Sequence, residues 1–103
     1  MKVVWMEQAE KALLRTAKLV QSEFGKKSSE RLLRDTHRMG CLLAENPNLG
    51  HIEPLLANKP ATYRSIVVNR LNKIVYRIVD DTIEIADFWE VRREPSTLAN
   101  QVK

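Results

Sequence analysis

The side chains best suited to chemistry in this chain of 103 residues are basic and recur between Tyr63 and Pro95. The positively charged residues of that stretch are Arg64, Arg70, Lys73, Arg77, Arg92 and Arg93. Guanidinium and ammonium groups bind phosphate and carboxylate groups through charge-assisted hydrogen bonds. The pattern therefore predicts a surface that meets a ligand bearing phosphate or carboxylate.

Three consecutive strands are predicted to position these cations. Apolar runs of Val, Ile and Tyr, which favour a pleated and half-buried surface, occupy most of residues 63–90. Asn69-Arg70-Leu71-Asn72 separates the first strand from the second, and Asp80-Asp81-Thr82 separates the second from the third. The third strand leads into a loop, residues 90–95, that carries Arg92 and Arg93.

Alternation along the strands predicts which side chains share a face. In the middle strand, residues 73–79, the side chains expected in the core are Ile74, Tyr76 and Ile78. The opposite face carries Lys73, Val75, Arg77 and Val79. Lys73 and Arg77 are then about 13 Å apart along the strand. In the preceding strand Arg64 shares a face with Ile66 and Val68, and we expect Arg64, Lys73 and Arg77 to face outward together.

Structural roles compete with functional ones for each of these residues. An arginine that pairs with Glu84 or Asp87 across the strands would be structural. Aromatic residues such as Trp89 are more often packing residues than stacking platforms. Arg92 and Arg93 leave the sheet together, where they are free either to reach a ligand or to lie in a solvated loop.

The residues before the strands predict a short strand and a helical hairpin. Met1 to Trp5 is a short apolar run typical of a strand. Glu7 to Phe24 has helical spacing, and Gly25 follows it as a C-terminal cap. A second helix is predicted to start after a cap at Ser28 or Ser29 and to run to about Ala44. The apolar positions expected to be buried are Ala9, Ala12, Leu13, Ala17, Val20 and Phe24 in the first helix and Leu32, Leu33, Thr36, Met39 and Leu43 in the second.

The remaining segments have little periodicity. Asn46-Pro47-Asn48 ends the second helix, because proline lacks the amide donor that a helix needs. Residues 49–62 contain Gly50, Pro54 and Pro60 and are expected to form an irregular crossover. Pro95 is expected to open a short closing helix that extends to Val102.

The order of these elements predicts the fold class. Helices grouped before an antiparallel sheet indicate an α+β fold of two layers, with the N-terminal strand and the helical hairpin packed on the sheet. The first strand is expected to pair most simply beside the last or the middle strand. With no repeats or linkers, residues 1–103 are expected to form one domain.

Composition narrows the functional classes. Lys and Arg number 17 against 13 Asp and Glu, a mild excess that permits an acidic or nucleic-acid partner without demanding one. No apolar run approaches the roughly 18 residues of a membrane helix, and no signal peptide is recognisable, so no membrane partner is expected. Cys41 is the single cysteine, which favours a reducing, cytoplasmic compartment. We expect no metal site and no cofactor, since potential ligands are not clustered.

Several stretches together resemble one protein family. They are Asn46-Pro47-Asn48-Leu49-Gly50, Tyr63-Arg64-Ser65, the strand from Lys73 to Ile78 and the ending from Phe88 to Pro95. In their combination and order, over nearly the whole chain, they resemble the RelE/ParE superfamily, the toxin halves of bacterial type II toxin–antitoxin modules. The resemblance implies two helices on a twisted antiparallel sheet and a co-encoded antitoxin that neutralises the toxin.

The resemblance leaves two activities open. RelE-like members enter the ribosomal A site and cleave mRNA, whereas ParE-like members bind DNA gyrase and poison it without nuclease chemistry. In either case operator DNA would be bound only through the antitoxin complex. The long first helix and the Asn46–Gly50 turn are more similar to ParE. A toxin that has lost its activity and retains only antitoxin binding is a third alternative.

A RelE-like enzyme, an endoribonuclease, would need catalytic groups, and the resemblance implies three of them. Arg64 falls where a strand lysine is expected, Lys73 where a strand arginine is expected, and Arg93 where the loop arginine is expected. Arg77 is added to this set because it is predicted to share the cationic face. Ile66 replaces a second strand lysine, and the late tyrosine or histidine has no counterpart near Leu98. Residues expected to contact the antitoxin or the target are Arg64, Trp89, Arg92 and Arg93.

Overall fold

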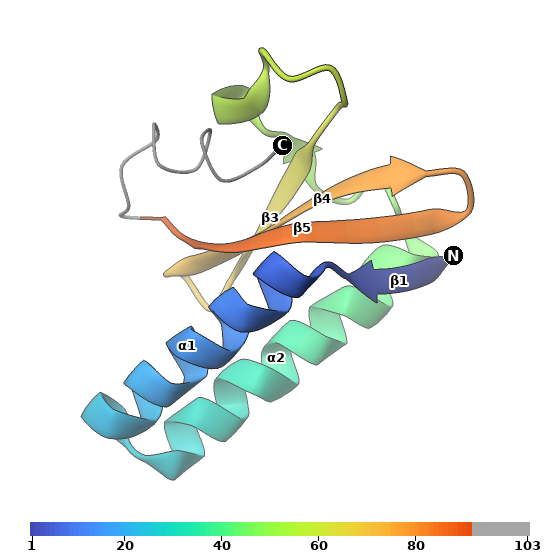
Figure 1. The fold of residues 1–103 in the computed structure, drawn as a ribbon. Helices are drawn as coiled ribbons and strands as arrows, with labels where there is room; N and C mark the ends of the chain where they lie inside the picture. Colours follow the sequence, from blue (N-terminus) through green and yellow to red (C-terminus); the bar gives the residue numbers. More distant parts are fainter. Residues whose placement is uncertain (92–103) are drawn as a thin grey trace.

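The computed structural model describes residues 1–91, and its core is one sheet with a helical pair on one face (Figure 1). The strands are β1 (Lys2–Trp5), β2 (His51–Ile52), β3 (Arg64–Val68), β4 (Asn72–Val79) and β5 (Thr82–Glu90). The helices are α1 (Glu7–Phe24), α2 (Lys26–Glu45) and the 3₁₀ turn η1 (Pro54–Leu56). The α+β prediction is confirmed, while the closing helix predicted from Pro95 lies outside the described residues.

The five strands lie in the order β1-β5-β4-β3-β2. β1 pairs with β5, one of the two neighbours expected from the sequence, but it does so in parallel. The other neighbours, β5 with β4, β4 with β3 and β3 with β2, are antiparallel. No helix within residues 1–91 is long and apolar enough to cross a membrane.

The helical hairpin turns within a single residue. Gly25 has φ 97°, a conformation that glycine adopts without steric cost, and α2 restarts at Lys26. The prediction that Ser28 or Ser29 caps α2 is therefore wrong, because the helix has already begun. Ser29 is buried instead and donates a 2.8 Å hydrogen bond from Oγ to the carbonyl of Ala17, which ties the two helices together.

The buried residues of α1 are all alanines, whose small side chains allow the helix to approach α2 and the sheet closely. The residues of α1 and α2 that are buried are Ala9, Ala12, Ala17, Ser29, Leu32, Thr36, Gly40 and Leu43. Leu13, Val20 and Met39 are partly buried against this core. The predicted burial of Phe24 and Leu33 is wrong: Phe24 lies at the hairpin turn, beyond the sheet, and both side chains are exposed.

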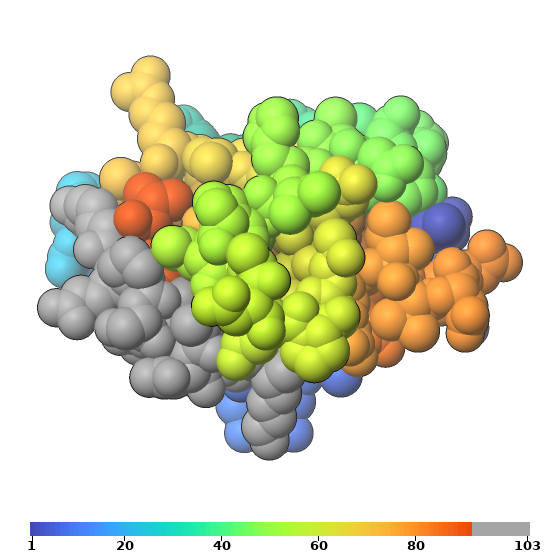
Figure 2. Space-filling view, turned by 90° about the horizontal axis from the view of Figure 1, so that it is seen from above, coloured from blue at the N-terminus to red at the C-terminus, as the bar shows by residue number. Residues whose placement is uncertain are grey.

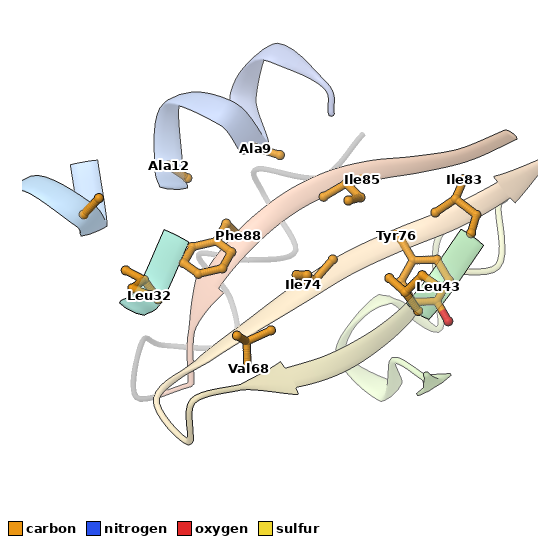
Figure 3. Close-up of a cluster of buried hydrophobic side chains, with 11 residues drawn as sticks. Ala9, Ala12, Leu32, Leu43, Val68, Ile74, Tyr76, Ile83, Ile85 and Phe88 are labelled. Carbon is orange, nitrogen blue, oxygen red and sulfur yellow. The ribbon is translucent and has the colours of Figure 1, made fainter. Parts of the chain in front are cut away.

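The main core lies between the helices and the sheet (Figure 3). Its strand residues are Val68, Ile74, Tyr76, Ile83, Ile85 and Phe88. Ile74 and Tyr76 face the helices as predicted, but Ile78 is partly exposed because it lies near the end of the β4–β5 hairpin.

A bulge in β5 alters the simple alternation of faces. Tyr76 pairs with Ile85 and Val75 pairs with Asp87, so Ala86 is an extra residue. After the bulge, Phe88 packs in the helix-side core, while Trp89 packs on the other side with Leu56 and Val75. Strict alternation from Ile83 would have placed Phe88 on the face opposite the helices.

The crossover between α2 and β3 covers the second face of the sheet. Leu56 and Tyr63 from this segment bury Val75 and Trp89 in a small second core. We call residues 54–63 the covering segment; in Figure 2 its yellow-green atoms lie over the middle of this face, beside the orange β4–β5 hairpin. The outer face was predicted to be a partly apolar and partly cationic surface that meets a ligand, and this segment covers its apolar residues Val75 and Trp89.

Candidate functional site

The turn at residues 46–50 is held by the hydroxyl of Tyr76. The amide of Gly50 donates to Tyr76 Oη at 2.9 Å, and Tyr76 Oη donates to the carbonyl of Pro47 at 2.8 Å. A Cβ at residue 50 would lie 2.7 Å from the carbonyl oxygen of Ser65 and 2.8 Å from Tyr76, so only glycine fits. Burial raises the pKa of Tyr76, although the Gly50 amide and the positive charge of Arg64 oppose this shift, and the hydroxyl remains a donor.

Arg64 belongs to this same anchoring network. Arg64 pairs with Tyr76 across the sheet, and directly opposed residues share a face. Its Nη1 donates to the carbonyl of Gly50 at 2.9 Å. The prediction that Arg64 faces outward together with Lys73 and Arg77 is wrong, because Lys73 pairs with Val67 and therefore lies on the opposite face.

Lys73 is engaged in a largely buried ion pair with Glu53. The side chain of Lys73 is 15% exposed and that of Glu53 is 2% exposed. Glu53 also accepts hydrogen bonds from Ser65 Oγ and from the amide of Leu55, both at 3.1 Å. Burial alone would raise the pKa of Glu53, but the bonds from Lys73, Leu55 and Ser65 and the charge of Lys73 outweigh it and lower the pKa.

Glu53 was not predicted to be a site residue, although the sequence carries a signal for it. Glu53 is the only acidic residue between Glu45 and Asp80, a stretch that contains Arg64, Lys73 and Arg77. An isolated acid among cations is a natural partner for one of them. It also stands immediately before Pro54, where it accepts from the Leu55 amide and starts the 3₁₀ turn of the covering segment.

Arg77 pairs with Glu84 on the neighbouring strand, one of the two structural pairings considered from the sequence. Arg77 Nε donates to Glu84 Oε1 at 2.8 Å. The hydrogen bond to Glu84 is the main cause of the raised pKa of Arg77; the charge of Glu84 and an interaction with Tyr63 contribute, against partial burial. The side chain of Arg77 remains 37% exposed, so part of the guanidinium faces solvent.

Arg64 and Arg77 meet at one pocket although they lie on opposite faces of the sheet. β3 begins at Arg64, whereas β4 continues past its partner Tyr76 to Val79, so the edge of β4 is open at this end. A pocket of about 380 Å³ lies there. Its lining residues are Asn48, Ala61, Thr62, Arg64, Arg77, Ile78 and Val79. We call it the edge pocket.

The other predicted site residues are not brought together in the described part of the chain. Trp89 is 1% exposed and packs with Leu56, Tyr63 and Val75. A direct contact between Trp89 and a partner would therefore require the covering segment to move. Arg92 and Arg93 lie outside the described residues.

The basic residues of the described part of the site are divided between two pockets. Arg64 and Arg77 present positive charge at the edge pocket, whereas Lys73 is paired with Glu53 and both residues line a second pocket of about 510 Å³. The hydroxyl of Tyr76 is engaged by the turn at residues 46–50. A general acid or base must reach the proton that it transfers, and neither Lys73 nor Tyr76 lines the edge pocket.

Comparisons with known proteins give a match in fold. The chain is similar to a chain of a solved structure described as "Chromosomal ParDE TA system from P. aeruginosa", with a TM-score of 0.74 and 18% sequence identity. The match covers 89% of this chain and 97% of that one. No family model and no curated protein matches the sequence.

Proposed function

We propose that this chain is the toxin component of a type II toxin–antitoxin module and belongs to the RelE/ParE superfamily. The shared fold with a chain of a ParDE system supports this proposal. The residues of the sequence resemblance also support it, since Pro47, Gly50, Arg64 and Tyr76 meet in one hydrogen-bonded network. A cognate antitoxin would be the partner that neutralises it, and operator DNA would be bound only by the complex.

The toxin acts by contact with its target, as ParE-like members do, and DNA gyrase is the proposed target. The observation that carries this choice is the ion pair between Lys73 and Glu53. A ribonuclease of the RelE type would use Arg64, Lys73, Arg77 and Arg93 around one phosphate. Lys73 is instead paired with Glu53 on the face opposite Arg64, where both line a pocket separate from the edge pocket.

Ribosome-dependent mRNA cleavage is the competing function, and one variant separates it from contact toxicity. In the double variant Glu53→Gln/Lys73→Met, the carboxylate and the ammonium are removed together, so no unpaired charge is left buried. A nuclease that depends on Lys73 would lose cleavage by about 10²-fold or more. A contact toxin would retain growth inhibition in this variant.

The experiment combines induced expression with two readouts. Expression without an antitoxin is expected to arrest growth, to inhibit supercoiling by gyrase in extracts and to leave transcripts intact. The control is the same chain expressed together with the protein encoded by the neighbouring reading frame, which is expected to restore growth. Cleaved transcripts with normal supercoiling would favour the ribonuclease, and unimpaired growth would favour a toxin that retains only antitoxin binding.

A further inference from the structure

The edge pocket combines two arginines with apolar walls. Arg64 and Arg77 are its charged residues, Asn48 and Thr62 add polar side chains, and the other lining residues are Ala61, Ile78 and Val79. Both Ile78 and Val79 are 36% exposed. A ligand that fits such a pocket carries negative charge next to apolar surface.

The two guanidinium groups retain donors for a ligand. Each arginine has five N–H donors; Arg64 uses Nη1 for the Gly50 carbonyl, and Arg77 uses Nε for Glu84 and also interacts with Tyr63. The hydrogen bonds therefore fix the positions of the two groups without exhausting their donors. Fixed donors lose little conformational freedom when a ligand binds, which favours recognition.

The charge at the pocket fits a singly charged group. Glu84 offsets the charge of Arg77, whereas Arg64 is bonded to a neutral carbonyl, so these three groups leave one uncompensated positive charge. A carboxylate carries one negative charge, whereas a phosphate monoester carries about 1.5 to 2 near neutral pH, so the net charge favours the carboxylate over a monoester or free phosphate. A nucleic-acid phosphodiester also carries one charge, and it is the apolar walls formed by Ala61, Ile78 and Val79 that favour a carboxylate on a polypeptide over it.

We propose that the edge pocket binds the carboxylate of an acidic side chain in a polypeptide partner, with apolar residues of that partner against Ile78 and Val79. Arg64 and Arg77 hold the carboxylate from the two faces of the sheet, and Thr62 and Asn48 flank it. The inference is independent of the proposed function, because it concerns the chemistry of the bound segment and not the consequence for gyrase or the ribosome.

The test is a titration of isotope-labelled protein with short peptides, followed by NMR. The probes are acetylated Leu-Ala-Glu-Ala-Leu amide, the same peptide with Gln in place of Glu, and inorganic phosphate at matched ionic strength. The Nε–Hε resonances of Arg64 and Arg77 are expected to shift saturably with the Glu peptide, at millimolar concentrations typical of a small contact. The Gln peptide and phosphate are expected to bind at least about fivefold more weakly.

Three variants sharpen the titration. Arg77→Gln is expected to weaken binding of the Glu peptide by about tenfold, the effect of one hydrogen bond to a charged group. Glu84→Gln removes the offsetting charge and is expected to strengthen binding. Arg31→Gln, at an exposed position on α2, is expected to leave it unchanged. The backbone spectrum of each variant reports whether it is folded.

Defined outcomes would overturn the proposal. Equal shifts with the Gln peptide would show that charge is not recognised, and tighter binding of phosphate would identify a phosphate site instead. The absence of saturable shifts at about 10 mM Glu peptide would also reject the pocket, since even a weak specific contact is populated at that concentration. Toxicity or its absence has no influence on these readings, so failure here is distinguishable from failure of the proposed function.

Discussion

At the scale of single residues, partners decide what each basic side chain can do. Lys73 and Arg77 lie on the same face of β4, yet Lys73 is largely buried against Glu53 and Arg77 is over one-third exposed beside Glu84. Arg64 lies on the other face and is bonded to a backbone carbonyl. The three basic residues of β3 and β4 therefore have different roles. Lys73 holds the start of the covering segment through Glu53, whereas Arg64 and Arg77 line the edge pocket.

Breaking the Glu53–Lys73 pair from one side should be costly. Lys73→Met leaves the carboxylate of Glu53 buried without its counter-charge, and we expect the free energy of unfolding at neutral pH to fall by about 3–5 kcal/mol. The double variant Glu53→Gln/Lys73→Met should recover much of this loss. Lys11→Met, which breaks an exposed pair with Glu7, should cost much less, because exposed ion pairs contribute little to stability. Urea denaturation measures all three, and equal losses for Lys73→Met and Lys11→Met would contradict the role assigned to the pair.

The same pair predicts a dependence of stability on pH. The pKa of Glu53 is lower in the folded chain than in the unfolded chain, so the unfolded chain binds more protons as the pH falls. The contribution of Glu53 is therefore present above its unfolded pKa of about 4.5 and is lost as the pH falls through its lower folded pKa. The difference in stability between the wild type and Lys73→Met should narrow over that acidic range. A constant difference down to acidic pH would contradict the assignment.

Two glycines should respond to alanine in opposite directions. Gly50→Ala places a Cβ within 2.8 Å of Tyr76 and Ser65 and should destabilise the chain by about 1–3 kcal/mol. Gly40→Ala, in the interior of α2 with no atom within 4 Å of the added Cβ, should stabilise it by up to about 1 kcal/mol. Thermal unfolding compares the variants directly. A neutral Gly50→Ala variant would mean that the anchoring network around Tyr76 tolerates the displacement of its turn.

At the scale of elements, the covering segment decides how much of the sheet face is accessible. It contributes Leu56 and Tyr63 to the second core and is joined to β4 through Glu53 and Lys73. The segment therefore hides Val75 and Trp89 while leaving the edge pocket open at the start of β3.

Truncating one leucine of the covering segment should expose Trp89. Leu56 is 2% exposed, and Leu56→Ala should cost about 2–5 kcal/mol, whereas the neighbouring Leu55→Ala, at a position that is 36% exposed, should cost less than about 1 kcal/mol. In a Trp5→Phe background, which leaves Trp89 as the single tryptophan, Leu56→Ala should shift the fluorescence emission to longer wavelength. An unchanged emission maximum would show that Trp89 remains covered without Leu56.

The spacing of apolar residues predicted where the helices and strands lie better than it predicted which side chains share a face of the sheet. The helices, the three late strands and the α+β class follow from apolar spacing and from Gly25 and Pro47. The orientation of Arg64 depends on the register of β3 against β4, and the side of Trp89 depends on the bulge at Ala86. Neither the strand register nor the bulge can be read from the spacing of apolar residues along one strand. The burial of Lys73 required a partner 20 residues away in a segment without regular spacing.

At the scale of the whole molecule, the two faces of the sheet are covered unequally. The helices bury one face through the main core, and the covering segment buries part of the other (Figure 1). On β3 and β4, Arg64 and Arg77 present positive charge at the edge pocket, whereas Lys73 lines a second pocket together with Glu53.

A supercoiling assay with purified chain, purified gyrase, ATP and relaxed plasmid distinguishes gyrase inhibition from mRNA cleavage. We expect inhibition that rises with the concentration of the chain, accumulation of cleaved plasmid trapped with gyrase, and the same inhibition by the folded Glu53→Gln/Lys73→Met variant. Unaffected supercoiling at high concentration, together with Lys73-dependent cleavage of mRNA on ribosomes, would contradict this expectation.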